Sequence, residues 1–289
     1  MAKTDILQVQ DQIQKFWSPM SAKELRQQLL LGGLVSKEFS GSLQRKGDTV
    51  YVSQVTAPAG QLRSIGVDAD SFDTDLLTTN RIAIVADKRA VAAYEIEDIV
   101  DLQSQLDKEN SDVRDALMYS VSKQINDYLY SLVAPSNAAP DHTITGIGTF
   151  AASNLAEVRK LLSEAKVPMD GNLWALLSPA YYADMLNAQT LTSSDYIGSE
   201  TPVVGGQIVS KRFGFNIVED NSRTGDYGLF FHPSWMNLVM QTEPVFKLSD
   251  LHSNKQFGYV LSVDLVFGCK AAFDGPVRHI TVTSKLKDF

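Results

Sequence analysis

A polar segment of the chain, residues 56–77, separates two stretches that are patterned as β-strands. β-Branched and aromatic residues alternate in 49–53, and Ile82 and Ile84 share one face of 81–85. The segment between them contains a proline, two glycines and four aspartates, with too few alternating apolar positions for a core element. Loops longer than about 12–15 residues are uncommon in compact domains, and an isolated hairpin is marginal in water. We therefore expect 56–77 to lie on another molecule.

A second strand pair is predicted at 81–85 and 90–96, and a long amphipathic helix follows it at 102–133. The apolar residues of this helix recur every three or four positions along one stripe. They are Leu106, Val113, Leu117, Val121, Ile125, Leu129 and Leu132. Ser111 is a candidate cap for the better-formed part of the helix, and Pro135 ends it. At about 1.5 Å per residue that part would span on the order of 33 Å, enough to brace a whole domain.

The second half of the chain alternates helix and strand signals, which predicts a small sheet with helices packed on it. Asn154 followed by Glu157 resembles a capping arrangement for one helix, and Ser178 with Pro179 is typical of the start of another. Strands are predicted at 173–177, 213–218, 228–231, 238–240, 257–267 and 277–283. The last two are expected to pair with the strands that flank the long helix.

The N-terminal region carries bulky apolar side chains on a segment that is otherwise polar. Phe16 and Trp17 stand just before a proline, which limits continuation of a helix. Further along, Gly32 and Gly33 are predicted to stop a helix. A neighbouring subunit is one candidate to bury the Phe-Trp pair, and the core of the same chain is the other.

Charge and hydropathy argue against two classes of protein. The chain has 26 Lys+Arg against 34 Asp+Glu and a net charge of -8, so as a whole it is repelled by a phosphate backbone. No window approaches the roughly 20 apolar residues that a membrane helix needs. The first residues also lack the apolar core of a secretion signal, which predicts a chain that stays in a cytoplasm. A container for DNA tolerates this charge, as do many other functions.

Residues that commonly carry chemistry are scattered along the chain. The four histidines have no metal-ligand spacing, and Cys269 is expected to be a small buried hydrophobe. The glycines in 146–148 and 205–206 lack the rest of a nucleotide-binding loop and are interpreted as turns. The acidic run at 95–101 is expected to form a solvated face rather than a carboxylate pair or a calcium site. The sequence therefore predicts no catalytic residue, no cofactor and no metal site.

Five short runs follow one another along the chain: 47–50 (GDTV), 79–88, 94–99 (YEIEDI), 174–179 (WALLSP) and 230–233 (FFHP). In this order they resemble the Hong Kong 97-type coat proteins of tailed bacteriophages, and the similarity spans nearly the whole chain. The resemblance implies an α+β fold with an N-terminal arm, an extended β-hairpin loop, a peripheral domain with a long spine helix, and an axial domain. It also implies a major capsid protein that is not an enzyme.

The same resemblance divides the chain into five segments. They are an arm at 1–46, an extended loop at 47–88, a peripheral domain with the long helix at 89–149, an axial domain at 150–245, and C-terminal strands of the peripheral domain at 246–289. In that family the axial domains surround the symmetry axes of pentamers and hexamers, while arm and loop overlap neighbouring subunits. This arrangement fits the apolar arm and the long polar loop.

The implied partners are further copies of the chain, in hexamers and pentamers of an icosahedral virion capsid assembled in the host bacterial cytoplasm. The shell would enclose double-stranded DNA without sequence-specific binding and would contact no membrane. A separate scaffolding protein and a portal are expected, because no long charged helical extension precedes the arm. A decoration protein is a further partner of such shells.

Contacts between subunits are assigned to Phe16 and Trp17 of the arm and to charged residues of the loop. Arg63 near the loop tip is the candidate for a salt bridge to a neighbouring subunit. The loop aspartates considered with it are Asp68, Asp70, Asp73 and Asp75. Segment 56–77 contains neither lysine nor asparagine, so the lysine–asparagine cross-link of some family members is not expected, and assembly should be non-covalent.

Two other classes of function remain open. An encapsulin-like compartment uses a similar fold to enclose a protein cargo instead of DNA. A hydrolytic or binding enzyme of α+β type should instead be monomeric or a small oligomer, with a concave pocket that contains titratable groups of perturbed pKa.

Overall fold

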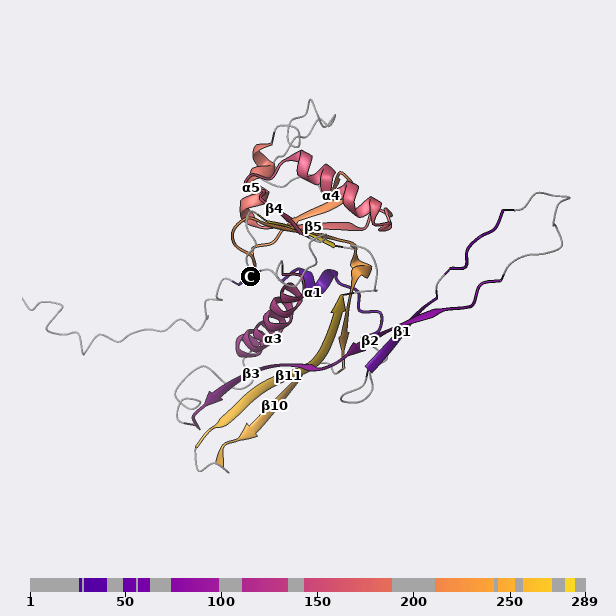
Figure 1. Ribbon diagram of the computed structural model, residues 1–289. Coiled ribbons are helices and arrows are strands. Elements are labelled where there is room, and N and C mark those ends of the chain that lie inside the picture. The colour runs from indigo at the N-terminus through magenta and orange to yellow at the C-terminus, as the bar shows by residue number, and fades with distance from the viewer. Residues whose placement is uncertain are drawn as a thin grey trace, which may run out of the picture.

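The computed structural model describes residues 26–27, 29–40, 49–55, 57–62, 74–98, 111–134, 143–188, 211–241, 244–252, 257–271 and 279–283. These residues form a six-stranded sheet, a four-stranded sheet and a separate two-stranded ribbon (Figure 1). Within them, no helix has the length and apolar character that crossing a membrane requires.

The six-stranded sheet has the order β4-β12-β8-β5-β7-β6. Its strands are β4 (Thr143–Thr145), β5 (Leu173–Leu177), β6 (Lys211–Arg212), β7 (Phe215–Glu219), β8 (Tyr227–Phe231) and β12 (His279–Thr283). The sheet is mixed, because β5 pairs in parallel with β7 and antiparallel with β8. Every residue of β8 and β12 is buried, so the centre of the sheet is covered on both faces.

Two helices, α4 (Ala152–Glu164) and α5 (Pro179–Asn187), cover one face of this sheet (Figure 1). Ser178 stands at the N-cap position of α5 and Pro179 is its first residue, as predicted, but the Ser178 side chain makes no capping hydrogen bond. The predicted cap of α4 is wrong, because helix α4 begins three residues earlier than a cap at Asn154 would allow. Ala151 is the N-cap, and the Asn154 side-chain oxygen reaches back to accept its backbone N–H at 2.8 Å.

The long helix α3 (Ser111–Leu132) packs under the opposite face of the six-stranded sheet (Figure 1). The predicted apolar stripe is buried at Leu117, Val121, Ile125 and Leu129. It meets alternate residues of β8, including Leu229 and Phe231, in the largest core cluster. The short helix α1 (Leu31–Leu34) adds Leu31 to that cluster. The predicted N-terminal part of the long helix, 102–110, and Pro135 lie outside the described residues.

The four-stranded sheet lies on the far side of α3. It consists of β3 (Lys88–Ile96), β9 (Met236–Met240), β10 (Val245–Asp250) and the long central strand β11 (Tyr259–Ala271). β11 pairs antiparallel with each of the other three. Alternate residues of β11, such as Leu261 and Leu265, face α3 and are buried.

The ribbon is a hairpin of β1 (Thr49–Val55) and β2 (Thr79–Val85), which projects away from both sheets (Figure 1). The strands are antiparallel, with Thr49 opposite Val85 and Val55 opposite Thr79. The face that carries Ile84, Val50 and Val52 packs at its base on buried Val239 of β9. The two predicted strands are confirmed, and residues 56 and 63–73 of the predicted loop between them lie outside the described residues.

Several predictions about pairing and helix ends are wrong. β2 and β3 do not pair with each other, because the chain bends between them and sends β2 to β1 and β3 to β11. β11 pairs with β3, the strand that precedes α3, as predicted, but β12 pairs with β4 and β8 of the six-stranded sheet. β9 lies in the four-stranded sheet rather than the small one. Gly32 and Gly33 lie inside α1 instead of ending a helix. The strand predicted from 213 begins at Phe215, since Phe213 has a φ of 51°.

These pairings have a common physical reason. A period of two in the sequence indicates a strand, whereas the partner of that strand is decided by packing between distant segments. Because β4 and β12 belong to the six-stranded sheet, two of its strands come from outside the 150–245 segment predicted to form the axial domain.

Candidate functional site

The outer face of the hairpin presents apolar side chains to solvent. Tyr51 is 55% exposed, Val55 59% and Val85 45%. They alternate with Val50 and Val52, which pack on the base of the hairpin, so one face of the ribbon is used within the chain and the other is not.

Beyond the paired strands the exposure increases. Leu76 is 90% exposed and Leu77 79%, and Leu62 on the opposite side of the hairpin is fully exposed. We define the hairpin patch as Tyr51, Val55, Leu62, Leu76 and Leu77. Single exposed apolar residues are ordinary on a protein surface, but a group of them on one projecting element marks an interaction site.

Polar contacts hold the two sides of the hairpin together. The Arg81 guanidinium lies 4.0 Å from the centre of the Tyr51 ring, a cation–π contact between the two strands. Past the last strand pair, the backbone N–H of Ala59 donates to the Asp75 carboxylate at 2.7 Å. Continuing the β1–β2 register brings Ala59 opposite Asp75, so the hairpin keeps its alignment beyond the hydrogen-bonded strands.

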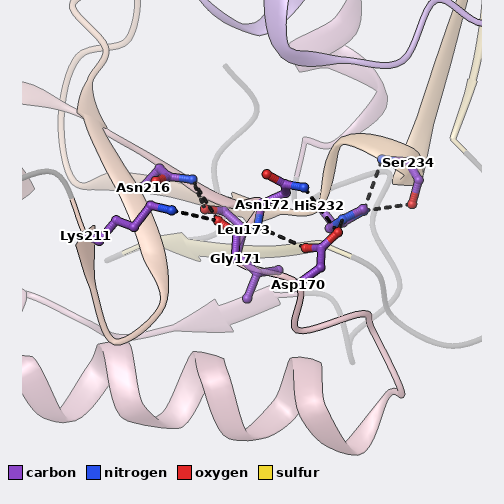
Figure 2. Close-up of polar contacts among 8 residues, drawn as sticks. All are labelled: Asp170, Gly171, Asn172, Leu173, Lys211, Asn216, His232 and Ser234. Carbon is purple, nitrogen blue, oxygen red and sulfur yellow. Dashed lines mark hydrogen bonds and ion pairs between the residues drawn. The ribbon is translucent and has the colours of Figure 1, made fainter.

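A polar cluster around His232 lies where β5 begins and β8 ends, at one end of the central strands of the six-stranded sheet (Figure 2). The His232 Nε2 atom lies 3.2 Å from the Asp170 carboxylate, and its Nδ1 atom lies 2.8 Å from the Ser234 hydroxyl. These are the residue types of a serine-hydrolase triad. However, the backbone N–H of Ser234 also donates to Nδ1, at 3.3 Å. Nδ1 therefore acts as an acceptor, and the imidazole caps the short 3-10 helix Pro233–Trp235.

The surroundings of Asp170 support a structural role for this cluster. Hydrogen bonds from the Asn172 backbone N–H and from His232 hold the pKa of Asp170 below its ordinary value. The Asn216 amide donates to the carbonyls of Gly171 and Leu173, at 3.3 and 3.2 Å (Figure 2). The cluster thus joins the start of β5 to the turn after β8, and it positions backbone rather than a reactive hydroxyl.

A buried polar contact joins α3 to the six-stranded sheet. The Tyr130 hydroxyl of α3 donates to the carboxylate of Asp220, which follows β7 and is 2% exposed. The Arg223 guanidinium lies 4.1 Å from the Tyr130 ring and 3.0 Å from Asp127. Burial raises the pKa of Tyr130 well above its ordinary value, so the hydroxyl stays protonated as the donor.

Other residues singled out in the sequence have ordinary surroundings. Glu95 and Glu97 are exposed, as predicted for a solvated face. Cys269 is half-buried, and burial raises the pKa of its thiol to about 12. In the part of the chain that the structure describes, no three His, Cys, Asp or Glu residues come together as metal ligands would.

No protein-family model matches the chain, and no curated protein sequence matches it. Solved structures match over nearly its whole length. The capsid structure of Cyanophage P-SCSP1u has a TM-score of 0.73 at 13% identity and covers 96% of this chain and 95% of that chain. A structure from Mycobacterium phage Che8 has a TM-score of 0.69 at 19% identity and covers 93% of this chain and 96% of that chain. The capsid asymmetric unit of Cyanophage Pam1 has a TM-score of 0.68 at 12% identity and covers 95% of this chain and 97% of that chain.

This chain has the Hong Kong 97-type capsid fold. The α+β fold implied by the sequence runs is therefore confirmed. At these identities the likeness concerns the fold, and it shows that elements with almost no sequence in common reach the same arrangement.

Most of the subunit contacts predicted for the capsid fold lie outside the described residues. Phe16, Trp17, Arg63, Asp68, Asp70 and Asp73 are in this group. Asp75 is described and exposed, and its Oδ2 atom is bound by the Ala59 N–H of its own hairpin. The predicted contacts between subunits stay predictions.

The hairpin patch was not predicted from the sequence. Leu76 and Leu77 directly follow the run of aspartates, and an adjacent apolar pair within an acidic loop is a signal that could have been used. Tyr51 lies on the opposite face to Val50 and Val52 in a strand that was predicted correctly, so its exposure follows once the buried face is known.

Proposed function

We propose that this chain is the major capsid protein of a tailed bacteriophage, which self-assembles through pentamers and hexamers into an icosahedral shell around double-stranded DNA. The observation that carries this proposal is the hairpin patch. A projecting ribbon of two strands with exposed Tyr51, Leu76 and Leu77 gains its stability when a neighbouring surface covers it.

The driving force for assembly is burial of apolar surface distributed over many subunit contacts. Each Å² of apolar surface removed from water contributes roughly 25 cal/mol. Obligate interfaces bury about 2,000–5,000 Å², so the hairpin patch would act together with the N-terminal arm, where Phe16 and Trp17 are the proposed anchors.

The arrangement of the two sheets supports separate axial and peripheral domains. The six-stranded sheet with α4 and α5 would form the axial domain around the local symmetry axes, and the four-stranded sheet with α3 the peripheral domain. The net charge of -8 suits a wall that encloses DNA without holding it, since basic walls would retain the phosphate backbone.

The partners of the proposed shell are a scaffolding protein and a portal during assembly in the host cytoplasm, and a decoration protein on the finished virion. Within the shell, Arg63 would form a salt bridge to an aspartate of a neighbouring subunit. Normal shells from an Arg63→Glu variant would contradict that contact.

The test is negative-stain electron microscopy of the chain expressed together with the neighbouring genes of its genome. Closed icosahedral shells that contain nuclease-protected DNA are expected. Shells that contain a protein cargo instead would assign the chain to a compartment, and dispersed small particles at high concentration would overturn the proposal.

A matched pair of variants tests the hairpin patch itself. Leu76→Ser with Leu77→Ser should abolish or strongly reduce shell formation. Met169→Ser changes an apolar residue that is also exposed, at 38%, but lies next to the six-stranded sheet, and it should assemble normally. Equal assembly of both variants would show that the hairpin patch is not an interface.

A further inference from the structure

Gly268 lies on β11 at the point where the hairpin leaves the four-stranded sheet. The backbone between β2 and β3 crosses directly over this residue. A Cβ atom at position 268 would lie 2.1 Å from the carbonyl oxygen of Val85 and 2.8 Å from the Cα atom of Ala86. Non-bonded heavy atoms attract at about 3.5–4.0 Å, so no residue with a side chain fits unless the two backbones separate.

On one side of this crossing the chain is firmly held. β3 begins at Lys88, which pairs with Phe267 of β11. The Phe267 ring packs edge-on against Tyr128 of α3, with 5.5 Å between ring centres, and the Lys88 Nζ atom lies 5.8 Å from the Tyr128 ring centre. Both the strand ladder and the helix therefore fix the start of β3.

On the other side the hairpin has no such ladder. Among the described residues, β1 and β2 form strand pairs only with each other. The hairpin meets the rest of the chain through a small cluster of Ile84, Ala86 and Val239, with Val50, Val52, Val266 and Phe39 packed around it. Because strand hydrogen bonds do not set the direction of the hairpin, the close approach of Val85 and Ala86 to β11 does so.

We propose that Gly268 is a positioning residue that sets the direction of the extended hairpin, and that this direction makes the subunit competent to assemble. The second half of this inference rests on the proposed function. A side chain at 268 would push the crossing apart by roughly 1.5–2 Å, given the contact distance above. Because β2 carries the displacement away from the sheet at about 3.3 Å per residue, the far end of the hairpin would move further than its base.

The direction of the hairpin can be measured in the full chain by spin labelling. Cysteines introduced at exposed Ser53 of the hairpin and exposed Ser249 of β10 carry the two labels, and excess unlabelled chain suppresses distances between subunits. The native Cys269 is replaced by alanine in every labelled variant, so that only the two introduced cysteines carry a label.

The informative variant is Gly268→Ala, and its matched control is Gly228→Ala. A Cβ atom at Gly228 also meets close neighbours, with Leu177 Cδ2 at 3.0 Å and Phe230 Cε2 at 3.2 Å, but it lies in the six-stranded sheet. We expect Gly268→Ala to shift the distance between the labels by about 2 Å or more, or to broaden its distribution at least twofold. Gly228→Ala should leave the distance unchanged.

A distance in Gly268→Ala that equals that of the wild type would overturn the inference. If Gly268→Ala does not fold, Ala86→Gly decides, because it loosens the backbone of the crossing segment itself without adding an atom. A broadened distance in Ala86→Gly supports the positioning role of the crossing, and a wild-type distance contradicts it.

Shell formation separates this inference from the proposed function. Normal shells from a Gly268→Ala subunit whose hairpin has moved would contradict the link between direction and assembly while leaving the positioning role intact. Failure of the wild type to form shells would overturn the proposed function, and the label distances would still decide the role of Gly268.

Discussion

The six-stranded sheet and the hairpin are both built from short strands, but they bury their apolar residues in different places. In the sheet all five residues of β8 are buried, and the Phe230 ring lies 5.9 Å from that of Phe150 and 5.4 Å from that of Phe215. In the hairpin, Tyr51 and Val55 are more than half exposed. One region completes its core within the chain, and the other leaves the apolar residues on one of its faces uncovered.

This difference indicates how stability and assembly are divided along the chain. Substitutions in the six-stranded sheet should lower the free energy of unfolding of the subunit, because they remove contacts that exist before assembly. Substitutions on the outer face of the hairpin should leave that free energy nearly unchanged and weaken the shell.

The largest effect on the subunit is expected for Phe230→Ala. The ring is fully buried between α4, α5 and the sheet, so its removal leaves a cavity. Replacing a buried phenylalanine by alanine lowers the free energy of unfolding by about 3–5 kcal/mol. Urea denaturation followed by tryptophan fluorescence measures this value. A loss below about 1 kcal/mol would show that the core of the six-stranded sheet is not complete within the unassembled subunit.

A smaller loss is expected for Tyr130→Phe at the contact between α3 and the six-stranded sheet. The variant keeps the ring but removes the hydroxyl that donates to buried Asp220, which then retains the Ser222 backbone N–H at 2.8 Å. Leaving a buried acceptor short of a partner costs about 1–3 kcal/mol. The control is Tyr94→Phe on β3, whose side chain is 44% exposed, and an equal effect of the two variants in urea denaturation would contradict the prediction.

The next effect concerns Asp264, which joins three strands of the four-stranded sheet. Its carboxylate lies 2.7 Å from Lys247 Nζ of β10 and 2.6 Å from Arg89 Nη2 of β3. Hydrogen bonds from Lys247 and Arg89 hold the pKa of Asp264 below its ordinary value. Asp264→Asn should therefore lower the free energy of unfolding by about 0.2–1 kcal/mol at neutral pH.

The lowered pKa of Asp264 determines the direction in which the stability difference between the wild type and Asp264→Asn changes with pH. Since the pKa of Asp264 is lowered in the folded chain, its stabilising contribution is fully present above the ordinary carboxyl pKa of about 4. The contribution is lost as the pH falls through the lower pKa of the folded chain. The stability difference between the wild type and Asp264→Asn should shrink in acid, and a difference that grows in acid would contradict the assignment.

The smallest effect on the subunit is expected for Val55→Ser on the outer face of the hairpin. Exposed substitutions usually change stability by less than about 0.5 kcal/mol, so urea denaturation of the unassembled subunit should not distinguish the variant from the wild type. The yield of shells in sedimentation should nevertheless fall. A variant that loses subunit stability as strongly as Phe230→Ala would remove the contrast between the two regions.

Local patterns determined many elements of this fold. Pro179 begins α5 as predicted because a first-turn proline acts on its own helix, whereas the Ser178 hydroxyl accepts the Tyr227 backbone N–H of β8 instead of capping α5. The stripe through Leu117 and Leu129 predicted the buried side of α3 for the same reason, since helical periodicity depends only on neighbours along the chain. The order of short runs was enough to predict the capsid fold.

The tertiary structure decided what depends on distant partners. β12 and β11 have similar strand patterns, yet β12 lies between β4 and β8 whereas β11 forms the centre of the other sheet. The candidate site shows the same limit, because the apolar pair Leu76 and Leu77 in an acidic loop indicates a contact but does not tell whether the same chain or another covers it. Gly268 carries no local signal either. Its role arises only where Val85 crosses β11, a contact between segments that are far apart in the sequence and meet only in the folded chain.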